Sequence, residues 1–163
     1  MLDPQKLESD RKKSVALALQ EDIGSGDITA ALVDAKTNYH ARVITREAAT
    51  ICGVEWVNET FRQLDPTVEL LWHFKDGDSA LTNDTLFEAK GSARSILSAE
   101  RTALNFLQLL SGTATTAAEY AAAVHGATTH VLDTRKTLPG LRTAQKYAVR
   151  CGGCMNHRIG LYD

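Results

Sequence analysis

Residues 130–161, HVLDTRKTLPGLRTAQKYAVRCGGCMNHRIGL, indicate the fold class of this chain most directly. Residues 130–132 are the apolar core of a short strand, and residues 138–140 are typical of a turn. The segment 141–150 has the apolar spacing of a helix that stops at two glycines, and 156–161 has the composition of another strand. Strand, helix and strand in this order predict a right-handed βαβ unit with two parallel strands.

One βαβ unit does not make a stable domain, because a parallel sheet is normally buried on both faces and needs more than two strands. The second predicted strand is followed by only two residues, and the chain of 163 residues is too short for a (β/α)8 barrel, which needs about 250. We therefore expect the last part of the chain to be the start of an α/β domain that is truncated at Asp163.

The part of the chain before this unit has a different pattern. Residues 67–74 alternate between apolar and polar side chains, as a half-buried strand does, and two further strands are expected at 39–45 and 85–90. Helices are expected at 9–20 and at 54–64, where the apolar residues share one helical face. This order predicts an α+β sandwich in which helices pack on one face of a small antiparallel sheet.

Two linking helices are expected between these parts. Helical periodicity begins at Ser98, Gly112 is expected to interrupt it, and an alanine-rich second helix is expected to end near Gly126. The predicted domains are therefore 1–112, the sandwich with the first linking helix, and 113–163, the second linking helix with the βαβ unit.

The composition is that of a soluble globular protein, with 44% apolar and 23% charged residues. No apolar run is long enough to span a membrane, and the polar first residues do not resemble a signal peptide. A net charge of −2 and 6% aromatic residues argue against nucleic-acid binding. We expect a cytoplasmic protein with reduced thiols and with neither a membrane nor a nucleic acid as partner.

Positive charge is concentrated at the end of the chain, where residues 133–163 hold six Lys or Arg against two Asp. Arg135 and Lys136 follow the first strand of the βαβ unit, and His157 and Arg158 fall on the second. The first pair lies at the carboxyl end of its strand, where α/β folds place their functional loops, and the second pair lies on the neighbouring strand. Converging from adjacent strands, these side chains would form a cationic pocket for small polyanions. The alternative is structural, with Arg135 paired to Asp133 and His157 a partly buried, hydrogen-bonded residue.

The spacing of Cys151, Cys154 and His157 also suggests zinc ligands, and Cys52 or one of two upstream histidines could supply a fourth. The cysteine pair is expected at a helix C-terminus, where the helix dipole disfavours a thiolate. We therefore interpret these cysteines as small residues that fill the core, and we expect no metal ligands within the chain.

Four blocks of the sequence, in order, carry a family likeness: 21–29 (EDIGSGDIT), 100–106 (ERTALNF), 132–142 (LDTRKTLPGLR) and 156–158 (NHR). Together they resemble quinolinate phosphoribosyltransferase. The resemblance implies an N-terminal sandwich followed by an open, seven-stranded α/β barrel, of which this chain holds the sandwich, the linking helices and the first βαβ unit. It also implies a magnesium-dependent reaction of NAD biosynthesis. Quinolinate and phosphoribosyl pyrophosphate then give nicotinate mononucleotide, pyrophosphate and carbon dioxide.

The resemblance assigns roles to the cationic residues. Arg135 and Arg158 correspond to the pair that holds the quinolinate carboxylates, with His157 beside them, and Thr134 adds a polar contact. Lys136 corresponds to the lysine that meets phosphoribosyl pyrophosphate and the charge that develops on pyrophosphate. Lys136 and Arg135 are accordingly the expected catalytic residues.

Arg101 corresponds to an arginine that reaches into the pocket of the partner subunit in a homodimer. The resemblance places the Mg²⁺ ligands, a further substrate lysine and the phosphate-binding loops beyond Asp163. We therefore expect this chain alone to be inactive or weakly active. Two other classes stay open: a non-catalytic dimerising or assembly protein that keeps the sandwich, and a metal module of cysteines and histidines.

Overall fold

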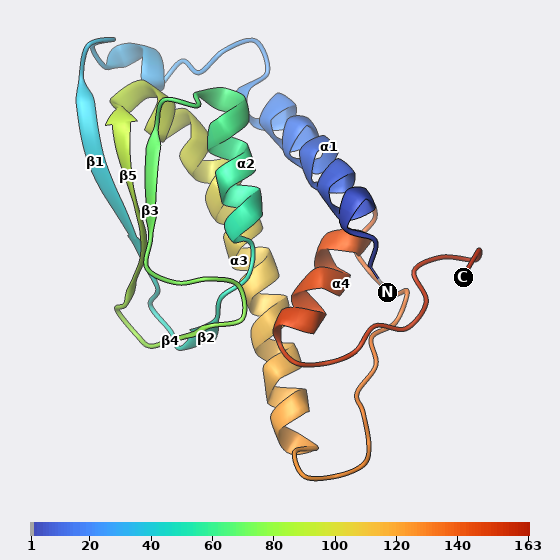
Figure 1. Ribbon diagram of the computed structural model, residues 1–163. Coiled ribbons are helices and arrows are strands. Elements are labelled where there is room, and N and C mark those ends of the chain that lie inside the picture. Colours follow the sequence, from blue (N-terminus) through green and yellow to red (C-terminus); the bar gives the residue numbers. More distant parts are fainter. Residues whose placement is uncertain (1) are drawn as a thin grey trace.

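The main sheet consists of three antiparallel strands in the order β1 (Asn38–Ile44), β5 (Thr85–Ser92) and β3 (Glu69–Trp72) (Figure 1). The computed structural model describes residues 2–163. Side chains alternate across the sheet as the sequence predicted, so that Trp72 packs on Phe87 at a ring distance of 4.4 Å while Leu71 is exposed. A second pair of strands, β2 (Ala49–Thr50) and β4 (Ser79–Ala80), was not expected.

Helices α2 (Val54–Leu64) and α3 (Ala93–Ala123) cover one face of this sheet (Figure 1). The core between them includes Val57 of α2, Leu107 of α3 and Phe87 of the sheet, all buried. Burial of this apolar surface is the main stabilising contribution to the fold. The predicted α+β arrangement, with helices on one face of a small antiparallel sheet, is confirmed.

Helix α3 is continuous, and the expected interruption at Gly112 is wrong. Glycine in a helix interior costs about 1 kcal/mol relative to alanine. Here Gly112 is exposed, while its neighbours Leu110, Ser111 and Ala114 are buried. Packing on both sides of the glycine therefore offsets its low helix propensity. The boundary that we predicted between residues 112 and 113 lies inside this helix.

Helix α1 (Pro4–Ile23) is longer than the expected 9–20. Its first turn begins at Asp3, whose carboxylate accepts a hydrogen bond from the Gln5 N–H at 3.0 Å, and Pro4 occupies the first helical position. Val15 anchors the helix in a second core cluster. Neither α1 nor any other helix of residues 2–163 combines the length and apolar character that a membrane span requires.

Helix α4 (Arg142–Cys151) packs against α3 in this second cluster, on the side away from the sheet (Figure 1). The strands expected at 130–132 and 156–161 are not formed. A single parallel bridge, Leu132 to Met155, takes their place. The parallel direction of the βαβ unit is thus correct, but the ladder does not extend. No further strand of residues 2–163 pairs with the bridge, and Leu132 and Met155 are each 50% exposed.

Candidate functional site

The Leu132–Met155 bridge brings two polar segments to one edge of the molecule. Met155 N–H donates to the Val131 carbonyl and Asp133 N–H donates to the Met155 carbonyl, both at 3.0 Å. The segments 133–137 and 156–158 therefore leave the bridge side by side. They hold all but one of the residues that the sequence nominated for substrate binding.

Asp133 joins the two segments through a buried ion pair. Its Oδ1 accepts hydrogen bonds from Lys146 Nζ at 2.5 Å and from the His157 N–H at 2.7 Å, and its Oδ2 accepts one from Asn156 Nδ2 at 2.7 Å. Lys146 Nζ also donates to the His157 carbonyl at 2.9 Å, and the lysine side chain is only 1% exposed. The charges of this pair are therefore satisfied inside the fold.

Arg142, at the start of α4, makes a second connection between the segments. Its Nε donates to Thr137 Oγ1 at 3.1 Å, and its Nη1 donates to the Ile159 carbonyl at 3.2 Å. Gln145 Oε1 accepts a hydrogen bond from the Leu138 N–H at 2.8 Å. Helix α4 thus holds both segments in place with its polar side chains.

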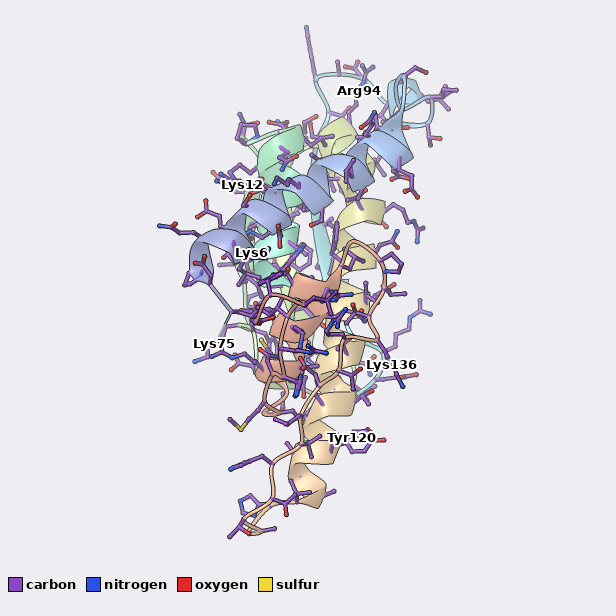
Figure 2. The ribbon with its side chains drawn as sticks, turned by 90° about the vertical axis from the view of Figure 1, so that its right-hand side faces the viewer. Lys6, Lys12, Lys75, Arg94, Tyr120 and Lys136 are labelled. Carbon is purple, nitrogen blue, oxygen red and sulfur yellow. The ribbon has the colours of Figure 1, made fainter. Side chains whose placement is uncertain are left out.

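The 133–137 segment is a tight turn in which Thr134 and Lys136 are exposed. Lys136 N–H donates to Thr134 Oγ1 at 3.1 Å, and Thr137 N–H donates to the Arg135 carbonyl at 3.0 Å. Lys136 is exposed and projects from the surface in Figure 2. Arg135 is half-buried, and its Nε atom is buried with no hydrogen-bond partner. An unpartnered buried donor is costly, which favours an acceptor from a bound ligand at this position.

The cationic side chains of the two segments have no acidic partners. Within residues 2–163, the side chains of Arg135, Lys136 and Arg158 make no hydrogen bond or ion pair. Asp133 is occupied by Lys146, so the alternative in which Arg135 pairs with Asp133 is wrong.

The second aspartate of this region is also occupied. Asp163 accepts the N–H groups of Ile159 and Gly160 at 2.8 and 2.7 Å, and these hydrogen bonds lower the pKa of its carboxyl group. The positive charge near the bridge is therefore free for an external anion.

Arg101 lies elsewhere on the molecule. It is exposed on α3 and lines a separate polar groove of about 440 Å³ with the loop 22–29. Asp27 in that loop accepts the Ala30 N–H at 2.8 Å and the Ser98 hydroxyl at 2.7 Å, and these hydrogen bonds lower the pKa of its carboxyl. The structure gives Arg101 no ion pair with a described residue, and it does not join Arg101 to the segments 133–137 and 156–158.

An open apolar groove of about 780 Å³ lies next to Asp133, between α3 and the residues that precede the aspartate. Leu109, Thr116 and Tyr120 line it on the α3 side, and Leu132 lines it on the other. Tyr120 projects into solvent in Figure 2 and is 60% exposed. The groove therefore presents apolar surface to solvent directly beside the polar segments.

The zinc site suggested by Cys151, Cys154 and His157 is not formed. Cys154 is buried and its thiol donates to the Ala117 carbonyl at 3.1 Å, while His157 is exposed. Within residues 2–163, the one group of potential metal ligands is Cys52, Asp76 and Cys151.

The described residues do not fit Mg²⁺ either, because that ion requires several free oxygen ligands. The group around Cys52 is rich in sulfur, and the Asp133 carboxylate next to the candidate site is fully engaged.

The sequence analysis did not identify Lys146 and Asn156 as residues of the candidate site, although both bind Asp133. Lys146 lies between Ala144 and Ala148, which are both buried on α4. The signal that could have identified the Lys146–Asp133 pair is a lysine at a buried helix position, in a helix that follows an aspartate at a strand end. Only the fold shows that the lysine reaches back to Asp133.

Two family models cover most of the chain. The model described as quinolinate phosphoribosyl transferase, N-terminal domain, matches residues 27–111, and the one for the C-terminal domain matches residues 113–163. A probable nicotinate-nucleotide pyrophosphorylase [carboxylating] of Bacillus subtilis is 41% identical over 143 residues, which are 88% of this chain and 50% of the relative. The chain spans about half the length of the curated relatives it matches.

Solved structures have the same fold. The nicotinate-nucleotide pyrophosphorylase from Francisella tularensis superimposes with a TM-score of 0.92 at 48% identity, covering 95% of this chain and 56% of that one. NadC from Streptococcus pyogenes gives a TM-score of 0.91 at 38% identity, covering 100% and 57% respectively. The second likeness covers the whole chain and therefore includes the candidate site.

Proposed function

Because the chain belongs to the quinolinate phosphoribosyltransferase family, we propose that it supplies substrate contacts for an enzyme of NAD biosynthesis. The reaction joins quinolinate to the ribose of phosphoribosyl pyrophosphate and gives nicotinate mononucleotide, pyrophosphate and carbon dioxide. The observation that carries this proposal is the set of unpaired cations beside the Leu132–Met155 bridge, where the local aspartates are instead bound by Lys146 and by backbone N–H groups. Both substrates are small polyanions, and their negative charge is opposite to that of these side chains.

Quinolinate carries two adjacent carboxylates, which suit two guanidinium groups. We assign these contacts to Arg135 and Arg158, with His157 and Thr134 as neighbouring polar groups. Each planar guanidinium can donate two parallel hydrogen bonds to one carboxylate. The partnerless Nε of Arg135 supports this assignment, because a bound carboxylate would satisfy it. Binding of this kind fixes the orientation of the pyridine ring as well as its position.

Lys136 is assigned to the phosphoribosyl pyrophosphate side of the site. In the transfer step, the bond between C1′ of ribose and the pyrophosphate oxygen breaks, and its electron pair leaves with pyrophosphate. The pyridine nitrogen donates its lone pair to the cationic C1′. The Lys136 ammonium group would stabilise the negative charge that develops on pyrophosphate, so catalysis is mostly electrostatic. The positively charged ring nitrogen then favours loss of the C2 carboxylate as carbon dioxide.

The remaining features complete the proposal. The sheet with α2 forms the sandwich, α3 links it to the rest of the chain, and the residues after α3 begin an open α/β barrel at the Leu132–Met155 bridge. The enzyme is a cytoplasmic homodimer without nucleic-acid partners, in which Arg101 enters the partner subunit's pocket. The exposure of Arg101 and its lack of an ion pair among the described residues support that role. Magnesium would be held by groups outside residues 2–163.

Calorimetric titration of this chain with quinolinate tests the substrate assignment. We expect Arg135→Ala and Arg158→Ala each to weaken quinolinate binding by about tenfold or more, because a charge-assisted hydrogen bond contributes about 1.5–3 kcal/mol. Nicotinate has only one carboxylate, so at least one of the two substitutions should weaken nicotinate binding less than it weakens quinolinate binding. Arg46→Ala is the matched control, because Arg46 is exposed in the loop after β1, outside the segments 133–137 and 156–158.

Equal quinolinate affinity in the wild type and in both site variants would contradict the assignment. A magnesium-dependent assay for nicotinate mononucleotide then separates binding from turnover. We expect the 163-residue chain to show little or no turnover, because its described residues do not build a magnesium site. Turnover by the purified chain at the rate of a relative of full length would refute that expectation.

A further inference from the structure

Two thiols from distant parts of the sequence meet beside the first turn of α2. Cys52 lies just before that helix and Cys151 ends α4, and their sulfur atoms and an oxygen of Asp76 all lie within 4.8 Å of one another. Cys52 is fully buried and held by Ser111, whose hydroxyl accepts the Cys52 N–H at 3.0 Å and donates to the Cys52 carbonyl at 3.1 Å. Cys151 is half-buried, so it is the more accessible of the two residues.

The carboxylate beside the thiols already has a structural role. Asp76 Oδ1 accepts the N–H groups of Gly53 and Val54 at 2.8 and 3.0 Å, which caps α2, and Oδ2 accepts the Tyr147 hydroxyl at 2.8 Å. A metal ion would have to compete with these three hydrogen bonds and would find only two other ligands. Formation of a disulfide needs nothing more than the two thiols.

The electrostatics of the pair assign different roles to its members. The hydrogen bond from the Cys52 thiol lowers the pKa of the Cys151 thiol, and the nearby Arg150 guanidinium lowers it further. The same hydrogen bond raises the pKa of Cys52, and burial adds to that rise. Burial and the Asp76 carboxylate act in the opposite direction on the pKa of Cys151, and the net shift is downward. Cys151 is therefore the thiol that ionises first, and Cys52 is the buried thiol next to it.

We propose that Cys52 and Cys151 are a redox modification site that closes to a disulfide when a peroxide oxidises the protein. The Cys151 thiolate attacks one peroxide oxygen, the O–O bond breaks, and the hydroxide that leaves takes up the proton released by Cys151 to form water. The Cys52 sulfur then attacks the sulfenic acid of Cys151, and its proton leaves with the hydroxyl group as a second water. Two thiols lose two electrons, and the peroxide gains them.

The Cys52–Cys151 disulfide would covalently link α4 to the segment that precedes α2. Cys154, only three residues from Cys151, is not a competing partner in this structure, because its thiol is buried and bonded to the Ala117 carbonyl on α3. The inference does not depend on the proposed function, since it uses neither the substrates nor the cationic residues.

The test treats the reduced 163-residue chain with one equivalent of hydrogen peroxide, blocks free thiols with iodoacetamide, and measures the intact mass. Trypsin leaves Cys52 in peptide 47–62 and places Cys151 and Cys154 together in peptide 151–158. Variants therefore have to assign the bond. We expect the wild type and Cys154→Ser to lose two hydrogens and to give a 47–62/151–158 cross-link that dithiothreitol reverses. Cys52→Ser and Cys151→Ser should give no cross-link.

Two results would overturn the proposal. One is a wild-type disulfide that lies within peptide 151–158, which would join Cys151 to Cys154. The other is a Cys154→Ser variant in which iodoacetamide still alkylates both remaining thiols after the peroxide treatment. This result would overturn the proposal whether the thiols react too slowly with peroxide or a co-purifying zinc ion protects them. Cys154→Ser keeps both proposed partners, so its outcome decides the question even if Cys52→Ser fails to fold.

Discussion

Replacement of Lys146 by methionine removes the cation from the buried pair with Asp133 while keeping most of the side-chain volume. The variant loses the hydrogen bonds from Lys146 Nζ to Asp133 Oδ1 and to the His157 carbonyl. Removal of one partner from a buried ion pair typically costs about 3–5 kcal/mol. Asp133 keeps its hydrogen bonds from the His157 N–H and from Asn156, so we expect the free energy of unfolding to fall by about 3 kcal/mol, the lower end of that range.

Urea denaturation followed by tryptophan fluorescence measures this loss. Trp56 lies 5.5 Å from the Tyr147 ring on α4 and therefore reports on the docking of that helix. Lys136→Met is the matched control: Lys136 is exposed and unpaired among the described residues, so the substitution should change the free energy of unfolding by no more than about 0.5 kcal/mol.

A double variant distinguishes the ion pair from simple loss of packing. Asp133→Asn combined with Lys146→Met removes both charges. A flip of the Asn156 amide, whose Nδ2 now faces Asp133, would let its unpartnered Oδ1 accept from the new amide, with loss of the Asn156 hydrogen bond to the Lys146 carbonyl. We expect the double variant to be about 1–2 kcal/mol more stable than Lys146→Met alone. The reasoning is refuted if Lys146→Met is as stable as Lys136→Met, or if the two substitutions destabilise additively.

Three further predictions concern the site, the packing of α4 and the pH response. In a protein of the relatives' length that contains this chain, Arg135→Ala should raise the KM for quinolinate at least tenfold more than the KM for phosphoribosyl pyrophosphate; equal effects would contradict its role. Gly152→Ala should lower the free energy of unfolding by about 2 kcal/mol or more, because the new Cβ would lie 2.3 Å from the Ala114 carbonyl oxygen. Thermal unfolding would show this, and an unchanged Tm would disprove the close packing. Hydrogen bonds from Ser95 and Thr67 lower the pKa of Asp65. Its ionised form therefore stabilises the fold above the unfolded-state pKa near 4, and this advantage over Asp65→Asn should disappear as the pH falls further in acid-unfolding curves.

The elements with strong periodicity were predictable from the sequence because their physics is local. The strand alternation at 67–74 and the apolar face at 54–64 follow from side-chain geometry, and β3 and α2 formed there. The extent of α3 was not predictable in the same way. Burial of residues on both sides of Gly112 depends on the sheet and on α4, which a local pattern does not contain.

The candidate site was also only partly predictable from the sequence. The sequence alone determined that a βαβ unit would bring 133–137 and 156–158 to one edge with an excess of positive charge. Only the tertiary structure decided which cations are free, because Asp133 lies 13 residues from Lys146 and yet pairs with it rather than with its near neighbour Arg135. It also separated Cys151 from Cys154 and placed it beside Cys52. Ion pairs and thiol contacts form at distances of a few ångströms, and the packing of helices, not spacing along the chain, sets those distances.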